Sequence, residues 1–120
     1  MPLTLVIGHK NYSSWSLRPW ILLKHLGEPF NELVLPLYGD EFRTKIAKYS
    51  PAGRVPVLVD GDFNIWDSLA IVEHLAERTG HGWPKDPVAR AWGRSISAEM
   101  HSGFLVLRSQ CPMNVRATGR

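Results

Sequence analysis

The sequence predicts an α/β domain followed by the beginning of an all-helical one. Two observations support this prediction. Over residues 1–80, short apolar runs alternate with segments of helical spacing in the order β-α-β-α-β-β-α. A second long segment of helical spacing then begins near Pro87 and has an apolar face that it cannot bury alone. We therefore expect one domain at 1–80, a linker at 81–86 and the opening of a helical domain at 87–120.

The first half of the α/β domain has the pattern of a βαβ unit with a right-handed crossover. Leu3–Gly8 is almost continuously apolar, which is typical of a strand buried on both faces. Trp15–Leu26 has helical spacing, and Gly27 is a natural stop signal. Pro19 is compatible with this helix if it lies in the first turn. Asn31–Leu37 then predicts the second strand.

The second half predicts a hairpin with a covering helix. Gly39–Ser50 is a short polar segment that is either helical or irregular. Arg54–Asp60 and Gly61–Asp67 are expected to be two strands joined by a tight Asp-Gly turn. Asp67–Gly80 has the apolar spacing of an amphipathic helix, and its closing glycine marks the end of the domain.

A proline- and glycine-rich linker, His81–Pro87, separates this domain from the next helix. Asp86 followed by Pro87 is a typical helix start, with a capping side chain and a proline in the first turn. The helical pattern predicts one helix to about Gln110. Such a helix needs helical partners, and the chain ends at Arg120, so we expect a truncated helical domain.

Composition excludes several classes of protein. The chain has 120 residues, of which 44% are hydrophobic and 21% charged, as in soluble globular proteins. Its net charge of +3 comes from scattered basic residues, which disfavours a nucleic-acid partner. A single cysteine, Cys111, allows no intrachain disulfide, and the histidines lack metal-ligand spacing. No segment has the pattern of a membrane span or signal peptide, so we expect a cytoplasmic protein without a membrane or metal partner.

The Val55–Pro56 pair stands at the start of a predicted strand, although proline cannot donate to a sheet ladder. A cis peptide bond here would leave the N–H and C=O of Val55 free to pair with an extended peptide ligand. A trans proline on an edge strand would instead be purely structural. The residues alone leave both interpretations open.

Asp67 and Ser68 stand at the start of a predicted helix, where Ser68 is a good N-cap residue. Simple capping is one interpretation of this pair. The other is binding of an α-amino acid head group: Asp67 would pair with the ammonium group, while Ser68 and the helix N-terminus would take the carboxylate.

Three serines, Ser13, Ser14 and Ser16, stand at the start of the first helix, where backbone N–H groups favour an anion. One of them is needed as the N-cap. Another could donate a hydrogen bond to a bound thiolate and so lower the pKa of that thiol. They do not indicate a serine hydrolase, because no GxSxG motif surrounds them.

Together, "SSWSLRPWILLKHLG", "SPAGRVPVLVDGD" and "WDSLAIVEHLAE" resemble, in this order and spacing, the N-terminal thioredoxin-like domain of the cytosolic glutathione transferases. The first segment is similar to the serine-type motif of the zeta and theta classes. The resemblance covers nearly the whole chain, because the following linker and helix are similar to the start of that family's second, all-helical domain. It implies glutathione as a co-substrate.

The resemblance also implies roles for single residues. Ser13 matches the serine that stabilises the glutathione thiolate, with Ser14 and Ser16 as near alternatives. Val55 would hold the cysteinyl backbone of glutathione through its main chain, and Pro56 would shape that turn. These positions would form the thiol half of the site.

The resemblance implies that Asp67 and Ser68 hold the γ-glutamyl end of glutathione. At the glycyl end, the family has binding residues near the positions of Phe42, Arg43 and Arg54. Asp67 replaces the longer Glu or Gln that is usual in the family, which shortens its reach.

The implied function is that of a glutathione transferase, in which glutathione attacks an electrophilic small molecule as a thiolate. One alternative is glutathione-dependent cis–trans isomerisation of a maleyl-type diacid, as in zeta relatives, although Trp20 stands where that class has arginine. Another is a non-catalytic module that keeps the fold for interactions. The resemblance further implies a cytoplasmic homodimer with a role in detoxification.

Overall fold

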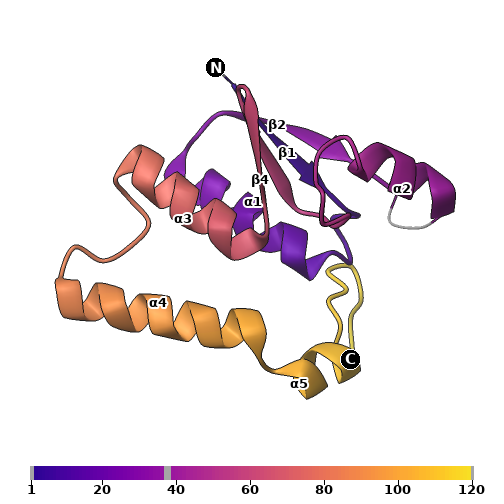
Figure 1. The fold of residues 1–120 in the computed structure, drawn as a ribbon. Coiled ribbons are helices and arrows are strands. Elements are labelled where there is room, and N and C mark those ends of the chain that lie inside the picture. Colours follow the sequence, from indigo (N-terminus) through magenta and orange to yellow (C-terminus); the bar gives the residue numbers. More distant parts are fainter. Residues whose placement is uncertain (1, 37–38, 120) are drawn as a thin grey trace.

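The computed structural model describes residues 2–36 and 39–119, which contain four strands and five helices (Figure 1). In chain order these are β1 (Leu3–Ile7), α1 (Ser14–Leu26), β2 (Phe30–Val34), α2 (Gly39–Ile46), β3 (Val57–Asp60), β4 (Phe63–Trp66), α3 (Ser68–Thr79), α4 (Pro87–Ser102) and α5 (Leu105–Gln110). The predicted order β-α-β-α-β-β-α is confirmed, and it is the order of a thioredoxin-like domain.

The four strands form one mixed sheet in the order β2-β1-β3-β4. Strands β1 and β2 are parallel, with Leu5 opposite Glu32, as a βαβ unit requires. Strand β3 is antiparallel to both of its neighbours. The sheet continues one residue beyond β2, because the Leu35 N–H donates to the Ile7 carbonyl at 2.8 Å. The predicted second strand extended to Leu37, which lies outside the described residues.

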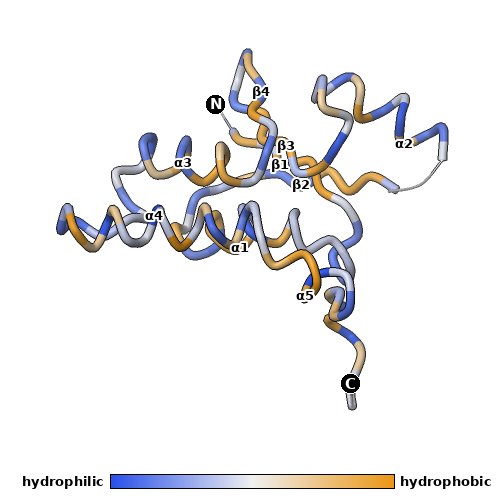
Figure 2. Tube along the Cα trace, turned by 60° about the horizontal axis from the view of Figure 1, so that its bottom comes forward, coloured by the Kyte–Doolittle hydropathy of each residue, from blue (hydrophilic) through white to orange (hydrophobic). Residues whose placement is uncertain are grey.

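Helices cover both faces of the sheet. Helices α1 and α3 lie together on one face and α2 lies on the other (Figure 1). The core on the α1/α3 face is formed by Leu3, Leu5, Ile7, Leu23, Leu58, Ile71 and Leu75. The core on the α2 face is formed by Val6, Leu35, Ile46 and Val57. The strongly apolar colours of β1 and β3 contrast with the polar colours of α2 in Figure 2. Burial on both faces explains the nearly continuous apolar run of β1.

Helix α1 begins one residue earlier than expected, at Ser14, and ends at Leu26 with Gly27 as the stop signal, as predicted. Gly27 is left-handed (φ +70°), and its N–H reaches the carbonyls of the last turn. Pro19 is the sixth residue of the helix, so its expected place in the first turn is wrong. A proline there removes the hydrogen bond to the Trp15 carbonyl. Its ring is buried, and that packing offsets part of the loss.

The expected single helix from Pro87 to Gln110 is divided into α4 and α5, so that prediction is wrong. Gly103 is extended (φ −124°, ψ −163°), and Phe104 is left-handed (φ +60°). A Cβ atom at position 103 would lie 2.9 Å from the Glu99 carbonyl oxygen, so this backbone path favours glycine. The predicted start is confirmed, because Asp86 Oδ2 accepts from the Ala89 N–H at 2.9 Å.

The β3–β4 hairpin is shorter than predicted, and its turn lies one residue later. Asp60 pairs with Phe63, so the two-residue turn is Gly61–Asp62. Strand β3 begins only at Val57, because Pro56 has no N–H for the ladder. This leaves the segment before β3 outside the sheet.

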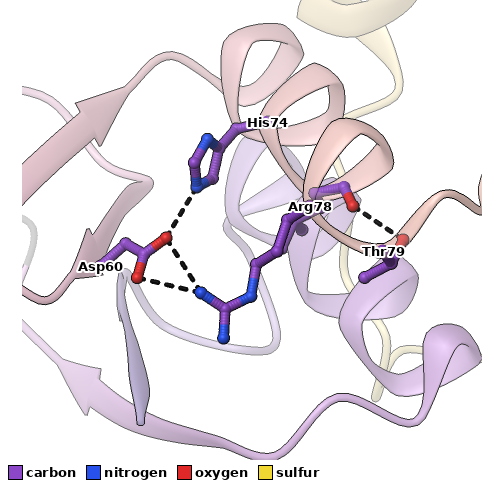
Figure 3. Close-up of polar contacts among 5 residues, drawn as sticks. Asp60, His74, Arg78 and Thr79 are labelled. Carbon is purple, nitrogen blue, oxygen red and sulfur yellow. Dashed lines mark hydrogen bonds and ion pairs between the residues drawn. The ribbon is translucent and has the colours of Figure 1, made fainter. Parts of the chain in front are cut away.

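An ion cluster ties the tip of this hairpin to α3 (Figure 3). The Asp60 carboxylate lies 2.8 Å from Nε2 of His74, and it accepts from Nη1 of Arg78 at 3.1 and 3.2 Å. The Asp60 side chain is only 12% exposed. The hydrogen bond from His74 is the main cause that lowers the pKa of Asp60, while burial acts in the opposite direction.

Candidate active site

One cleft brings together parts of all three segments that the sequence singled out. It has a volume of about 810 Å³ and is lined by Ser14, by Arg54, Val55 and Pro56, and by Asp67 and Ser68. Helices α4 and α5 complete it with His101 and Arg108. Pockets of this size, about 300–1,000 Å³, are typical of small-molecule sites. Six of the ten candidate site residues therefore line one cleft.

The Val55–Pro56 segment forms one wall of the cleft. The peptide bond between these residues is cis, one of the two possibilities that the sequence left open. Val55 lies outside the sheet, and the described residues offer no hydrogen bond to its N–H or C=O. Unpaired main-chain groups at the edge of a cleft can pair with an extended peptide.

Asp67, rather than Ser68, is the N-cap of α3, which corrects the expected cap. Its Oδ2 accepts from the N–H groups of Leu69 and Ala70 at 3.2 and 3.3 Å. Asp67 also has a φ of +81°, a conformation that costs on the order of 1–3 kcal/mol in a non-glycine residue. Such outliers concentrate at binding sites. Ser68 is the first helical residue, and its side chain is buried.

His101, near the end of α4, contacts both of these residues, and the sequence offered no signal for it. Its Nε2 lies 3.1 Å from Asp67 Oδ1, and its Nδ1 lies 3.4 Å from the Ser68 hydroxyl. The ring also stands edge-on to Trp15, with 5.2 Å between ring centroids. Helical spacing alone does not tell which face of α4 meets α3. The helix thereby adds a side chain to the γ-glutamyl half of the expected site.

The three serines at the start of α1 occupy different surroundings. Only Ser14 lines the cleft, and no described residue makes a hydrogen bond with its hydroxyl. Ser13 is at the N-cap position but makes no capping hydrogen bond; its hydroxyl donates to Ser16 Oγ at 2.7 Å. Ser16 is buried and accepts from the Gly8 N–H at 3.1 Å. Ser13 and Ser16 line a separate pocket of about 230 Å³.

The residues considered for the glycyl end are divided. Arg54 lines the cleft, whereas Phe42 and Arg43 do not. Phe42 lies on α2 and packs against the core on that face of the sheet. The Arg43 side chain is 83% exposed and lies 3.9 Å from Asp40. The structure therefore brings only Arg54 to the other predicted residues.

Trp15 is contacted by two arginines. The guanidinium carbon of Arg18 lies 4.2 Å from the centre of its ring, and that of Arg108 lies 4.8 Å from it. Burial and the positive charge of Arg108 lower the pKa of Arg18. This edge of the cleft is therefore positively charged, a property that helix-pattern reasoning did not predict.

The part of the chain that the structure describes holds neither a metal site nor a membrane-spanning helix. Residues 2–36 and 39–119 contain no group of three or more His, Cys, Asp or Glu side chains placed to hold a metal ion. In the same ranges, no helix combines the length and hydrophobicity needed to cross a bilayer.

Residues 12–78 match the sequence model of the glutathione S-transferase N-terminal domain. A dichloromethane dehalogenase from Methylophilus leisingeri is 43% identical over 61 residues, which cover 51% of this chain and 20% of that protein. A probable maleylacetoacetate isomerase from Caenorhabditis elegans is 34% identical over 98 residues, which cover 80% of this chain and 45% of that protein. The chain thus spans at most about half the length of these two relatives.

The fold has close counterparts among solved structures. A glutathione transferase homologue from Burkholderia, solved with bound glutathione, superposes with a TM-score of 0.74 at 26% sequence identity. The superposition covers 91% of this chain and 58% of that protein. It therefore extends beyond the α/β domain into the helices that follow it.

Proposed function

Because this chain belongs to the glutathione S-transferase family, we propose that it binds glutathione in the cleft and activates it for attack on an electrophilic small molecule. The observation that carries the proposal is the convergence of Ser14, Val55 and Asp67 on one cleft from three distant segments. A tripeptide has three chemically distinct parts, and each segment offers a group suited to one of them. In this proposal residues 1–80 form the glutathione-binding domain.

The tripeptide is held mainly through its backbone and its ends. The unpaired N–H and C=O of Val55 pair with the cysteinyl unit, as in the addition of a short strand. Asp67 binds the γ-glutamyl ammonium group, while Ser68 and the N-terminus of α3 bind the adjacent carboxylate. Arg54 pairs with the glycyl carboxylate. Pro56 keeps the wall beside the cysteine in place.

The thiol is activated at the N-terminus of α1. Unpaired N–H groups of the first turn and the Ser14 hydroxyl stabilise the thiolate, which lowers the thiol pKa. Lowering that pKa by one corresponds to about 1.4 kcal/mol of added preference for the thiolate. The thiol proton goes to solvent, the sulfur forms a bond to the electrophilic carbon, and the leaving group departs with its bonding electron pair. Ser13 and Ser16 support this turn through their mutual hydrogen bond.

Glutathione-dependent isomerisation is the second candidate, and the similarity to the probable maleylacetoacetate isomerase favours it. In that reaction the thiolate adds to a double bond, the carbon–carbon bond rotates, and the thiolate is expelled. Trp20 offers no help, because its Nε1 donates to Glu32 Oε1 at 2.7 Å, on the side of β2. Any charge recognition of a diacid must therefore come from other residues.

We also propose that the protein is a cytoplasmic homodimer with a role in detoxification, as is usual for this family. Large apolar side chains remain exposed on the last two helices, where Figure 2 shows apolar colours on α5. Trp92 and Ile96 on α4 are 70% and 68% exposed, and Leu105 on α5 is 73% exposed. Surfaces of this kind favour contact with another protein surface.

Calorimetric titration with three tripeptides tests the proposed function. Glutathione and S-methylglutathione should both bind, because the proposed contacts do not require a free thiol. The isomer with an α-linked glutamyl unit should bind at least about tenfold more weakly, since its ammonium and carboxylate are displaced from Asp67 and Ser68. Failure of both glutathione and S-methylglutathione to bind would exclude the proposal. Equal affinity for the α-linked isomer would exclude the assigned γ-glutamyl site.

A further inference from the structure

Arg18 and Arg108 both contact Trp15, and neither arginine has an acidic partner among the described residues. Neither guanidinium lies within ion-pair distance of a carboxylate in residues 2–36 and 39–119. The nearby acid, Asp67, is paired with His101 and caps α3. Two like charges held close together without a counter-ion are unfavourable, so the arrangement favours an anion.

Arg108 has a second unsatisfied feature. Its Nε is buried and has no hydrogen-bond partner in the described residues. The guanidinium carbon lies 4.8 Å from the centre of the Trp15 ring, and this contact gives Nε no hydrogen-bond acceptor. A buried N–H without an acceptor costs about 1–3 kcal/mol, and such groups are rare in folded proteins. A carboxylate can accept two parallel hydrogen bonds from one guanidinium.

The two arginines lie beside the expected glutathione contacts rather than among them. Arg108 lines the cleft together with Leu105, on the side formed by α5. Arg18 lines an adjoining pocket of about 280 Å³, which shares Ser68 and His101 with the cleft and is otherwise largely apolar. Of the groups proposed to contact glutathione, only Ser68 also lines this adjoining pocket. The position suits the second substrate.

We propose that Arg108, assisted by Arg18, binds a carboxylate of the second substrate, so that the site prefers electrophiles with an acidic group. This inference rests on the proposed function, because it assumes that glutathione occupies the rest of the cleft. The hydrocarbon part of such a substrate would lie against Leu105 and Trp15, and its carboxylate would satisfy Arg108. Arg108 and Arg18 would then determine specificity and take no part in forming the carbon–sulfur bond.

A matched pair of glutathione conjugates tests this preference without requiring turnover. The probes are S-(4-carboxy-2-nitrophenyl)glutathione and S-(4-carbamoyl-2-nitrophenyl)glutathione, which differ only in the charge of one substituent. Calorimetry on the full chain measures their dissociation constants and that of glutathione. The variants are Arg108→Gln, Arg18→Gln and Arg108→Lys. Arg116→Gln is the control, because Arg116 is exposed, does not line the cleft and loses the same charge.

The wild type should bind the carboxylate conjugate about tenfold more tightly than the carboxamide conjugate, and salt should reduce this difference. Arg108→Gln should abolish the preference while leaving glutathione affinity within about twofold. Arg18→Gln and Arg108→Lys should reduce the preference in part, and Arg116→Gln should keep it. Circular dichroism of each variant ensures that the loss does not reflect unfolding.

Three outcomes would overturn the proposal. Equal wild-type affinity for both conjugates would remove the carboxylate preference. Equal weakening of glutathione and both conjugates by Arg108→Gln would assign the arginine to a carboxylate of glutathione itself. If glutathione and both conjugates all fail to bind, the proposed function fails as well, and this is distinct from binding without preference.

Discussion

Asn11 and Asn114 are joined by a hydrogen bond although they lie 103 positions apart in the chain. Nδ2 of Asn11 donates to Oδ1 of Asn114 at 2.7 Å. Asn11 also accepts from the following segment: its Oδ1 from the Arg116 N–H at 2.7 Å, and its carbonyl from the Val115 N–H at 3.2 Å. One buried side chain just before α1 therefore holds the segment after α5 against the end of the α/β domain (Figure 1).

Asn11→Ala should release this segment. The variant loses both side-chain hydrogen bonds, each contributing about 1 kcal/mol. Water then solvates their former partners, the Asn114 side chain and the Arg116 N–H. We expect trypsin to cleave after Arg116 several-fold faster and the free energy of unfolding in urea to fall by about 1–2 kcal/mol. Asn31→Ala is the control, since Asn31 is exposed on the edge strand β2. An unchanged cleavage rate in Asn11→Ala would show that the segment is held by other contacts.

Asp60 should make the fold sensitive to acid. The hydrogen bond from His74 lowers the pKa of Asp60, and the charge of Arg78 assists. Because the folded pKa is below the unfolded value of about 3.9, the stabilisation is complete above that value. It is lost as the pH falls through the lower pKa of the folded state. Asp60→Asn should therefore cost on the order of 1–2 kcal/mol at neutral pH and much less in acid.

Urea unfolding as a function of pH measures this difference. The wild type and Asp60→Asn should converge in strong acid, where the aspartate is protonated in both folded and unfolded chains. Asp62→Asn provides the control, because Asp62 is exposed in the adjacent turn. A difference between wild type and Asp60→Asn that does not depend on pH would contradict a role for the charge.

Local signals in the sequence predicted most of the fold. Glycines at helix ends, an Asp-Pro helix start and apolar periodicity each act within a few residues, so a single sequence contains them. The break at Gly103 was missed because helical spacing continues across it. The backbone path at this position favours glycine because a Cβ atom would lie 2.9 Å from the Glu99 carbonyl oxygen, and helical periodicity contains no record of that constraint.

The candidate site was predictable only where it is built from short segments. The pairs Val55–Pro56 and Asp67–Ser68 stand out because each has unusual turn chemistry. His101 and Arg108 do not, because their roles depend on how α4 and α5 pack against the first domain. Contacts between segments that are distant in the chain produce no periodic pattern in the sequence. Which of the three serines can act on the thiol likewise depends on the surroundings of each side chain, and local sequence patterns do not reveal them.

His101 should act as a positioning residue for the γ-glutamyl head. Its Nε2 contact orients the Asp67 carboxylate, so His101→Ala should weaken glutathione binding about three- to tenfold. His101→Gln retains a side-chain donor and should recover part of the affinity. Binding of cysteinylglycine, which lacks the γ-glutamyl head, should not change. His81→Gln, in the exposed linker, is the control. Equal weakening of glutathione and cysteinylglycine would indicate a general structural effect.

Asp67→Asn should separate binding from capping. Asparagine caps helices about as well as aspartate, so the thermal midpoint of unfolding should stay within a few degrees of wild type. The ion pair with the γ-glutamyl ammonium group is lost, and the dissociation constant of glutathione should rise about tenfold. Asp67→Ala loses both functions and should also be less stable, by about 1 kcal/mol. Unchanged affinity in Asp67→Asn would place the ammonium group elsewhere.

The three serines at the start of α1 should give three different results when each is replaced by alanine. Ser14→Ala removes the hydroxyl that lines the cleft, so the thiol pKa of bound glutathione should rise by about one. Ultraviolet absorbance of the thiolate, followed against pH, measures that pKa. Ser16→Ala leaves the Gly8 N–H without its acceptor and should lower stability by about 1–3 kcal/mol.

Ser13→Ala is the decisive member of this series, because the family resemblance and the cleft favour different serines. The Ser13 hydroxyl donates to Ser16, and its pocket is separate from the cleft. We therefore expect only a small change in the thiol pKa. If Ser13→Ala raises that pKa and Ser14→Ala does not, the Ser13 hydroxyl must leave Ser16 and turn toward glutathione when it binds. This change needs only a rotation of the Ser13 side chain, which exchanges the Ser16 hydroxyl for the thiolate as its hydrogen-bond acceptor. The exchange is favourable, because a charged thiolate attracts a hydroxyl donor more strongly than a neutral hydroxyl does.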